Sequence, residues 1–166
     1  LYDERTTVAK KRRVDGTEDN VEEPAGIGTE IETSRETVVL SFITKKGDVG
    51  RRSGINWGQR AGRNLNQAYI PVPAKVRRME FFPPRRIPFI ILTDDNKSLD
   101  CVIAQQGDKG IHTYRDNSIL GSYIRERMNL PSGKFVERAD FRTYGRDDVT
   151  IQKIDDETFY MDFSVI

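Results

Sequence analysis

The chain has 166 residues, of which 36% are hydrophobic and 32% charged, with a formal net charge of +1. It fits one modest globular domain, and it holds neither an apolar run that could span a bilayer nor a signal peptide. The single cysteine, Cys101, excludes an internal disulfide and is expected to be a buried thiol. These features favour a cytoplasmic protein with no membrane partner. Because the chain begins at Leu1 rather than Met, we expect a fragment or a processed product.

Residues 1–36 differ from the rest of the chain. They carry six basic and ten acidic side chains, together with Pro24 and three glycines, and few of them could be buried. We expect a linker or lead-in segment here, followed by a single domain over residues 37–166.

The first part of that domain holds five predicted strands, each a β-branched or apolar run bounded by turn residues: 37–44, 68–72, 87–93, 99–105 and 110–114. Pro71 would place its strand at a sheet edge or a strand end. Residues 74–82 are expected to hold one helical turn, which Pro83 would stop.

One helix is predicted after Asp116 or Asn117, either of which can cap it. Its apolar residues share one face at helical spacing: Ile119, Leu120, Tyr123, Ile124 and Met128. The charged residues Arg125, Glu126 and Arg127 lie mostly on the opposite face. Three further strands are expected at 135–141, 149–154 and 158–164. Together these predicted elements indicate a mainly β barrel or sandwich with short helices.

The sequence contains no recognisable catalytic constellation. His112 is the only histidine and is followed by Thr113 and Tyr114, so the His-x-Lys pair of phospholipase-D-type nucleases is missing. No Glu-x-Lys triplet, Walker loop or dinucleotide fingerprint occurs, and one histidine with one cysteine is too few for a metal site. We therefore expect no catalytic residue, no metal and no cofactor in this chain.

Basic residues are concentrated in the middle of the chain. Residues 45–90 carry eleven basic side chains, eight of them arginine, against two acidic ones. A basic stretch between acidic flanks is typical of a surface that binds a polyanion, and arginine suits phosphates and guanine edges better than lysine does. A run of solvated cations is the alternative.

Segment 49–70 combines the side chains that read base edges. Four arginines stand there among amides and hydroxyls, and four glycines recur at every fourth position from Gly50 to Gly62. Arginine pairs with guanine, Asn and Gln pair with adenine, and an aspartate such as Asp48 can accept from cytosine. Alternatively, the amides satisfy the loop's own backbone. Trp57 is expected to anchor the loop in the core rather than stack on a base.

The stretches SGINWGQR and RNLNQAYIPVP resemble the carboxyl-terminal half of NgoFVII-type restriction endonucleases. In that family a phospholipase-D-type nuclease domain precedes a DNA-binding domain that is similar to the plant "B-three" domain. The resemblance extends over about Val38 to Ser164. It implies a mainly β, seven-stranded open DNA-binding pseudobarrel with short helices. It also implies two loops that grip the major groove, an N-arm at residues 45–60 and a C-arm at residues 105–114.

Side-chain chemistry then assigns two kinds of DNA contact. Base reading in the N-arm falls to Asp48, Arg51, Arg52, Asn56 and Gln59. Base reading in the C-arm falls to Gln105, Gln106, Asp108, Lys109 and His112. Phosphate contacts fall to Lys45, Lys46, Arg60, Arg63, Lys75, Arg77 and Arg78. The predicted interface is completed by Ser53 and Tyr114.

The resemblance implies double-stranded DNA as the partner, together with a nuclease domain of the same parent chain. The parent would be a type II restriction endonuclease of the bacterial cytoplasm, and this fragment would not be an enzyme by itself. Two other functions remain open. One is a β-barrel interaction module that binds an acidic protein or peptide, and the other is an enzyme with a dispersed site of carboxylates.

Overall fold

The computed structural model describes residues 36–165, so the linker expected at residues 1–36 lies outside the described residues except for Glu36. The described chain forms seven strands, β1 (Thr37–Ser41), β2 (Ile70–Pro71), β3 (Phe89–Thr93), β4 (Ser98–Ala104), β5 (Gly110–Thr113), β6 (Asp148–Asp155) and β7 (Thr158–Asp162). Between them lie the helices α2 (Ala74–Arg78), α3 (Ser118–Arg127) and α4 (Arg138–Tyr144), and the short 3-10 turns η1 (Gly54–Asn56) and η2 (Gln106–Asp108).

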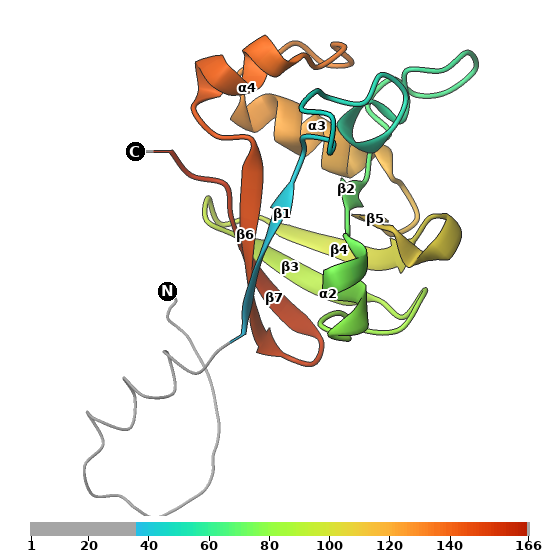
Figure 1. Ribbon diagram of the computed structural model, residues 1–166, viewed down its shortest axis with the longest axis vertical. Coiled ribbons are helices and arrows are strands. Elements are labelled where there is room, and N and C mark those ends of the chain that lie inside the picture. The colour runs from blue at the N-terminus through green and yellow to red at the C-terminus, as the bar shows by residue number, and fades with distance from the viewer. Residues whose placement is uncertain (1–35, 166) are drawn as a thin grey trace, which may run out of the picture. The chain divides into compact units, whose positions relative to one another are not determined.

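All seven strands belong to one sheet, in the order β1-β6-β7-β3-β4-β5-β2. Neighbouring strands run antiparallel except β3 and β7, which pair in parallel. The edge strands β1 and β2 contact each other, so the sheet curls into a nearly closed barrel (Figure 1). Pro71 lies in the edge strand β2, where a residue without an N–H is tolerated. The prediction of a mainly β open pseudobarrel with short helices is confirmed.

Alternation along the strands gives the sheet its buried face. In β3, Phe89, Ile91 and Thr93 are buried while Ile90 and Leu92 are exposed. The strands β1 and β7 follow the same period of two, which is the pleat period of a β-strand. Two clusters of aromatic rings add to the core, one made of Phe81, Phe82, Phe89 and Phe159, the other of Phe42, Phe141, Tyr144 and Phe163.

The predicted helix is confirmed as α3, and side chains fix both of its ends. Asp116 Oδ1 accepts a hydrogen bond from the backbone N–H of Ser118 at 3.0 Å, so Asp116 stabilises the first turn. In the last turn, Arg127 Nη2 lies 2.8 Å from Asp94 Oδ2 in the turn between β3 and β4. This half-buried ion pair ties the carboxyl end of α3 to the sheet.

The strand predicted at residues 135–141 is wrong, because Arg138–Tyr144 forms the helix α4 instead. Glu137 and Asp140 form a capping box in which each side chain accepts a hydrogen bond from the other residue's N–H. Gly145 ends the helix in a left-handed conformation with φ of 106°. The spacing of apolar residues imitates a strand here, and these local capping interactions favour the helix.

Helix α3 meets the loop that precedes β2 at Gly121. A Cβ atom at this position would lie 1.8 Å from the backbone oxygen of Asn66, so the helix and the loop touch without a side chain between them. Asn66 is itself fixed, since its Oδ1 accepts from the N–H of Gly133 at 2.8 Å and its Nδ2 donates to Ser132 Oγ at 2.9 Å. The loop before β2 is therefore packed directly on the helical layer.

We expect Gly121→Ala to lower the free energy of unfolding by about 1–3 kcal/mol, because the added methyl group must displace backbone atoms. Urea denaturation measures this loss. Ser122→Ala changes a half-buried residue of the same helix and is the matched control, expected to stay within about 0.5 kcal/mol of the parent chain. Unchanged stability of Gly121→Ala would contradict the close contact with Asn66.

Candidate nucleic-acid interface

The N-arm, residues 45–60, leaves the barrel through a tight turn after β1. The N–H of Thr44 donates to the backbone oxygen of Asp48 at 2.8 Å, and Thr44 Oγ1 donates to Asp48 Oδ1 at 2.7 Å. Lys45 and Lys46 are exposed within this turn. Asp48 is also exposed, but one of its carboxylate oxygens is already bonded to the hydroxyl of Thr44.

Asn56 lies in η1 and is fully buried, so its amide cannot reach a base edge. Its Nδ2 donates to the backbone oxygens of Gly50 and Val136, both at 2.9 Å, and its Oδ1 accepts from the N–H of Val136 at 2.9 Å. The side chain thus ties the N-arm to the segment between α3 and α4. The prediction that Asn56 reads bases is wrong, because its amide satisfies buried backbone groups instead.

Arg125 of α3 packs against the same loop, and only 1% of its surface is exposed. Its Nε donates to the backbone oxygen of Lys134 at 2.8 Å, its Nη1 to that of Gly121 at 3.2 Å, and its Nη2 to that of Ile55 at 3.3 Å. Burial lowers the pKa of this guanidinium to about 10, so it remains charged at neutral pH. Backbone carbonyls from three segments solvate a charge that water barely reaches.

The outward side of the loop carries four exposed arginines, Arg51, Arg52, Arg60 and Arg63. The Arg63 guanidinium carbon lies 4.5 Å from the centre of the Trp57 ring, which also packs edge-on against Tyr69 at 5.9 Å. Trp57 therefore anchors the loop and supports a cation at the same time. Arg60 Nη2 donates to the backbone oxygen of Arg52 at 3.0 Å.

The remaining polar residues predicted in the N-arm are half-buried. Gln59 Nε2 donates to the backbone oxygens of Leu65 at 3.0 Å and of Gly133 at 3.1 Å. Ser53 precedes η1 and makes no capping hydrogen bond with its side chain. Both donor hydrogens of Gln59 thus serve the backbone, so the arginines supply most of the loop's outward chemistry.

The C-arm is a short turn between β4 and β5. Gln105, Gly107 and Asp108 have positive φ angles of 72°, 74° and 61°. Two of these three residues are not glycine, so the backbone of the turn is strained. Gln106 and Lys109 are exposed in this turn. Only residues 105–109 of the predicted C-arm lie in the turn, because the next four belong to β5. We call residues 105–109 the C-arm turn.

His112 lies inside β5, not in the C-arm turn. It is half-buried between the buried residues Ile111 and Thr113. Its Nδ1 atom is buried and has no hydrogen-bond partner within residues 36–165. Burial lowers the pKa of the imidazole, and the nearby charge of Arg86 lowers it further. Tyr114, beyond the end of the strand, is exposed.

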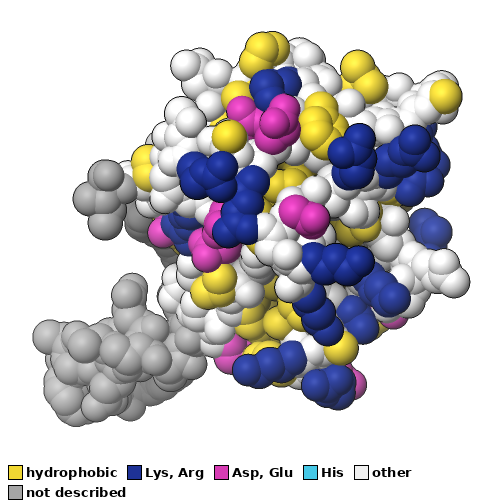
Figure 2. Space-filling view, turned by 45° about the horizontal axis from the view of Figure 1, so that its top comes forward, with side chains coloured by type: hydrophobic (Ala, Val, Ile, Leu, Met, Phe, Trp, Pro, Cys, Tyr) yellow, Lys and Arg dark blue, Asp and Glu magenta, His cyan; other side chains and the backbone are white. Residues whose placement is uncertain are grey.

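Helix α2 adds cations on the same side of the barrel as the two arms. Lys75 and Arg78 are exposed, whereas Arg77 is half-buried and its Nη1 donates to the backbone oxygen of Val72 at 2.6 Å. In Figure 1, α2 lies in front of the barrel below β2, while the C-arm turn and the loop after η1 project to the right; Arg77 of α2 and Asp108 of the C-arm turn line the same pocket. Figure 2 shows Lys and Arg side chains gathered over that part of the surface, with few carboxylates among them. We call the side formed by the N-arm, α2 and the C-arm turn the basic face.

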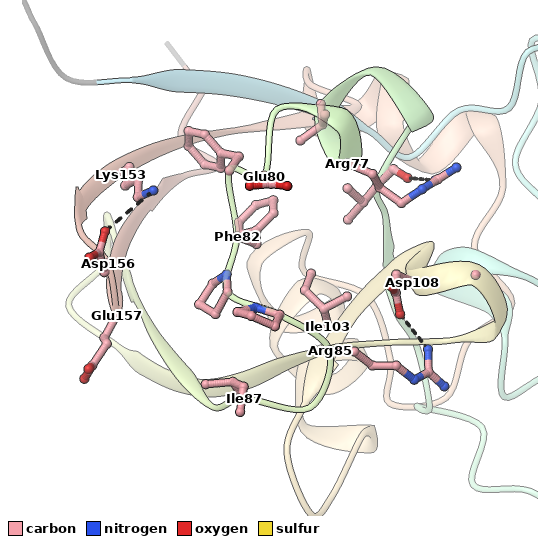
Figure 3. A pocket seen from close by; sticks show the side chains of 16 residues that line it. Arg77, Glu80, Phe82, Arg85, Ile87, Ile103, Asp108, Lys153, Asp156 and Glu157 are labelled. Carbon is pink, nitrogen blue, oxygen red and sulfur yellow. Dashed lines mark hydrogen bonds and ion pairs between the residues drawn. The ribbon is translucent and has the colours of Figure 1, made fainter.

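Sequence reasoning missed Arg85, which bonds the C-arm turn directly. Its Nη1 donates to the backbone oxygen of Gln105 at 2.6 Å. The same nitrogen donates to Asp108 Oδ1 at 2.8 Å (Figure 3). Arg85 and Asp108 also line a pocket of about 730 Å³ beside Phe82. Arg85 contributes to the basic stretch of the sequence, but its position after Pro83 and Pro84 gives no sign of its partners.

Residues 30–155 match the family described as the NgoFVII C-terminal B3-like DNA-binding domain. The chain belongs to this family. The resemblance drawn from the sequence is thereby confirmed. Solved structures that match this B3-like domain include that of a hypothetical protein from Arabidopsis thaliana, at 17% identity and a TM-score of 0.38, covering 78% of this chain and 89% of that chain. No curated protein matches.

The B3-like domain presents a surface whose chemistry is charge and hydrogen bonding. Among its described residues, no helix is long and apolar enough to cross a membrane. Residues 36–165 likewise hold no group of three or more His, Cys, Asp or Glu side chains that could bind a metal ion.

The pKa of His112, the only histidine in the sequence, measures how far its imidazole is buried. We expect the His112 pKa to lie below the ordinary 6.5, because burial and Arg86 both disfavour the charged imidazolium. Since the unfolded chain then binds this proton more readily, the contribution of His112 to stability is present above about pH 6.5 and is lost as the pH falls through the folded-state pKa. A titration of the ring proton by NMR measures the pKa. Arg86→Gln should raise it, and a wild-type value at or above 6.5 would contradict the burial of Nδ1.

Proposed function

We propose that this domain reads a specific duplex sequence by placing the N-arm and the C-arm turn in the major groove. The observation that carries the proposal is the exposure of Arg51 and Arg52 on a loop whose backbone is fixed by the buried Asn56 and Arg125. Discrimination between bases needs donors held in a fixed position, because a mobile side chain adapts to any base pair. A buried scaffold beneath exposed arginines meets that requirement.

The proposed contacts divide into two classes. Arg51 and Arg52 read base edges from the N-arm, and Gln106 and Lys109 read them from the C-arm turn. Phosphates are held by the other exposed cations of the basic face, which set the register of the domain on the duplex: Lys45, Lys46, Arg60, Arg63, Lys75 and Arg78. Arg77 is a weaker candidate, since one of its donors is bonded to the backbone of Val72.

We further propose that the domain brings a nuclease domain of the same parent chain, a restriction endonuclease, to its target. DNA hydrolysis would then take place outside this fragment. This part of the proposal rests on the resemblance to NgoFVII-type endonucleases and on the missing His-x-Lys pair in the sequence.

Selection from a random pool of duplexes should enrich one short site. At near-physiological salt we expect that site to bind at least about a thousandfold more tightly than random DNA, as specific sites usually do. Titration of the selected and scrambled duplexes measures the ratio. A ratio below about tenfold would count against base reading, since even one mismatched base pair usually costs about 1–3 kcal/mol. It would favour a module that binds acidic partners through charge alone.

Substitutions should separate base readers from phosphate contacts. Arg51→Ala or Arg52→Ala should cost about 1–3 kcal/mol on the selected site and relax the preference at one base pair. Lys75→Ala or Arg78→Ala should weaken binding to selected and to random DNA about equally. Each should also make the slope of the logarithm of the binding constant against the logarithm of the salt concentration shallower by about one. Titrations at several salt concentrations give both quantities. If all four variants lose the two kinds of binding in the same proportion, the N-arm is only an electrostatic clamp.

A further inference from the structure

The C-arm turn has a backbone that its own sequence does not favour. Gln105 and Asp108 are not glycines, yet both adopt positive φ angles. Non-glycine residues in this conformation are strained, so contacts from outside the turn must hold it. One contact within the turn is the hydrogen bond from the N–H of Asp108 to the backbone oxygen of Gln105 at 3.1 Å.

Arg85 supplies the contact from outside. A single nitrogen, Nη1, donates both to the backbone oxygen of Gln105 at 2.6 Å and to Asp108 Oδ1 at 2.8 Å, so it joins the two strained residues. The side chains of Arg85 and Asp108 are 40% and 49% exposed. Ion pairs this exposed add little to global stability. The effect of the contact is therefore on the geometry of the turn.

The backbone around Arg85 is itself anchored. The N–H of Arg86 donates to the backbone oxygen of Ile103 in β4, and the N–H of Ile87 donates to that of Pro84, both at 3.1 Å. Pro83 and Pro84 restrict the chain just before Arg85. Figure 3 shows the Arg85 side chain reaching to Asp108 along the edge of the pocket. Arg85 is thus presented to the C-arm turn from a turn before β3 whose backbone is hydrogen-bonded to β4.

We infer that Arg85 is a positioning residue for base recognition by the C-arm turn. It fixes the backbone of Gln105 and Asp108, so that the exposed side chains of Gln106 and Lys109 approach the bases in one geometry. It also pairs with the carboxylate of Asp108, which then shapes the turn and does not repel phosphates. The inference rests on the proposed function, because positioning has meaning only if the domain discriminates between bases.

A plain phosphate contact by Arg85 is the competing explanation, and the two differ in what they predict for Asp108. If Arg85 acts by positioning, Asp108→Ala lowers discrimination even though it removes a negative charge from the basic face. If Arg85 holds a phosphate, Asp108→Ala frees the guanidinium and strengthens binding to every duplex. The two residues must therefore be substituted singly and together.

The test measures dissociation constants of the selected and a scrambled duplex for the full chain, Arg85→Ala, Asp108→Ala and the double variant. We define the ratio as the dissociation constant of the scrambled duplex divided by that of the selected duplex. Either single substitution should lower this ratio by about tenfold, the order of one base contact. The double variant should have a ratio no lower than that of the poorer single variant. Arg142→Ala is the matched control, because it removes an exposed arginine of α4 outside the basic face and should leave both dissociation constants unchanged. Amide hydrogen exchange at residues 105–109 should be faster in Arg85→Ala than in the parent chain.

The outcomes separate the inference from the function beneath it. If the parent chain discriminates and Arg85→Ala keeps the ratio while losing random binding, Arg85 is a phosphate contact and the inference is overturned. Unchanged exchange at residues 105–109 in Arg85→Ala would overturn it as well. If the parent chain binds both duplexes equally, the proposed function itself fails, and that result appears before any variant is made.

Discussion

The position of the N-arm depends on the hydrogen bonds that the buried guanidinium of Arg125 donates. Its hydrogen bonds join α3 to the segment leading into α4 at Lys134 and to the N-arm at Ile55, 70 residues away in sequence. Loss of this side chain would remove the guanidinium donor from the backbone oxygens of Ile55 and Lys134, a larger cost than the loss of a surface pair. The loop that carries the exposed arginines is consequently fixed to the core through its buried residues Ile55 and Asn56.

The strands and the long helix were predictable because their signals are local. A continuous apolar and β-branched run marks β3, and apolar residues at helical spacing mark α3. Helix α4 was mistaken for a strand, since Val136 before it and Phe141 within it are spaced ambiguously and its capping box is a weaker signal than hydrophobicity. The order of strands in the sheet, with β7 between β6 and β3, depends on long-range pairing that no local pattern contains.

The site was predictable as a region but not residue by residue. The same polar residue types serve the interior and the surface, so composition alone could not separate Asn56, which is buried, from Arg51, which is exposed. Arg125 lies on the face of α3 expected to be polar, yet it is buried by a loop that precedes it by many residues. Arg85 gives no local signal because its partners lie in another turn.

The parallel pairing of β3 with β7 governs how the barrel can be assembled. On one side of that pair stand β6 and β1, on the other β4, β5 and β2, and the backbone pairing of β7 with β3 joins the two groups into one sheet. Phe159 and Met161 of β7 are fully buried between them. During translation, the edge of β3 that pairs with β7 therefore stays unpaired until residues 158–162 leave the ribosome. The N-arm follows a different order, because Arg125 and Val136, which hold it, are synthesised before β6 and β7 and can fix the loop before the barrel closes.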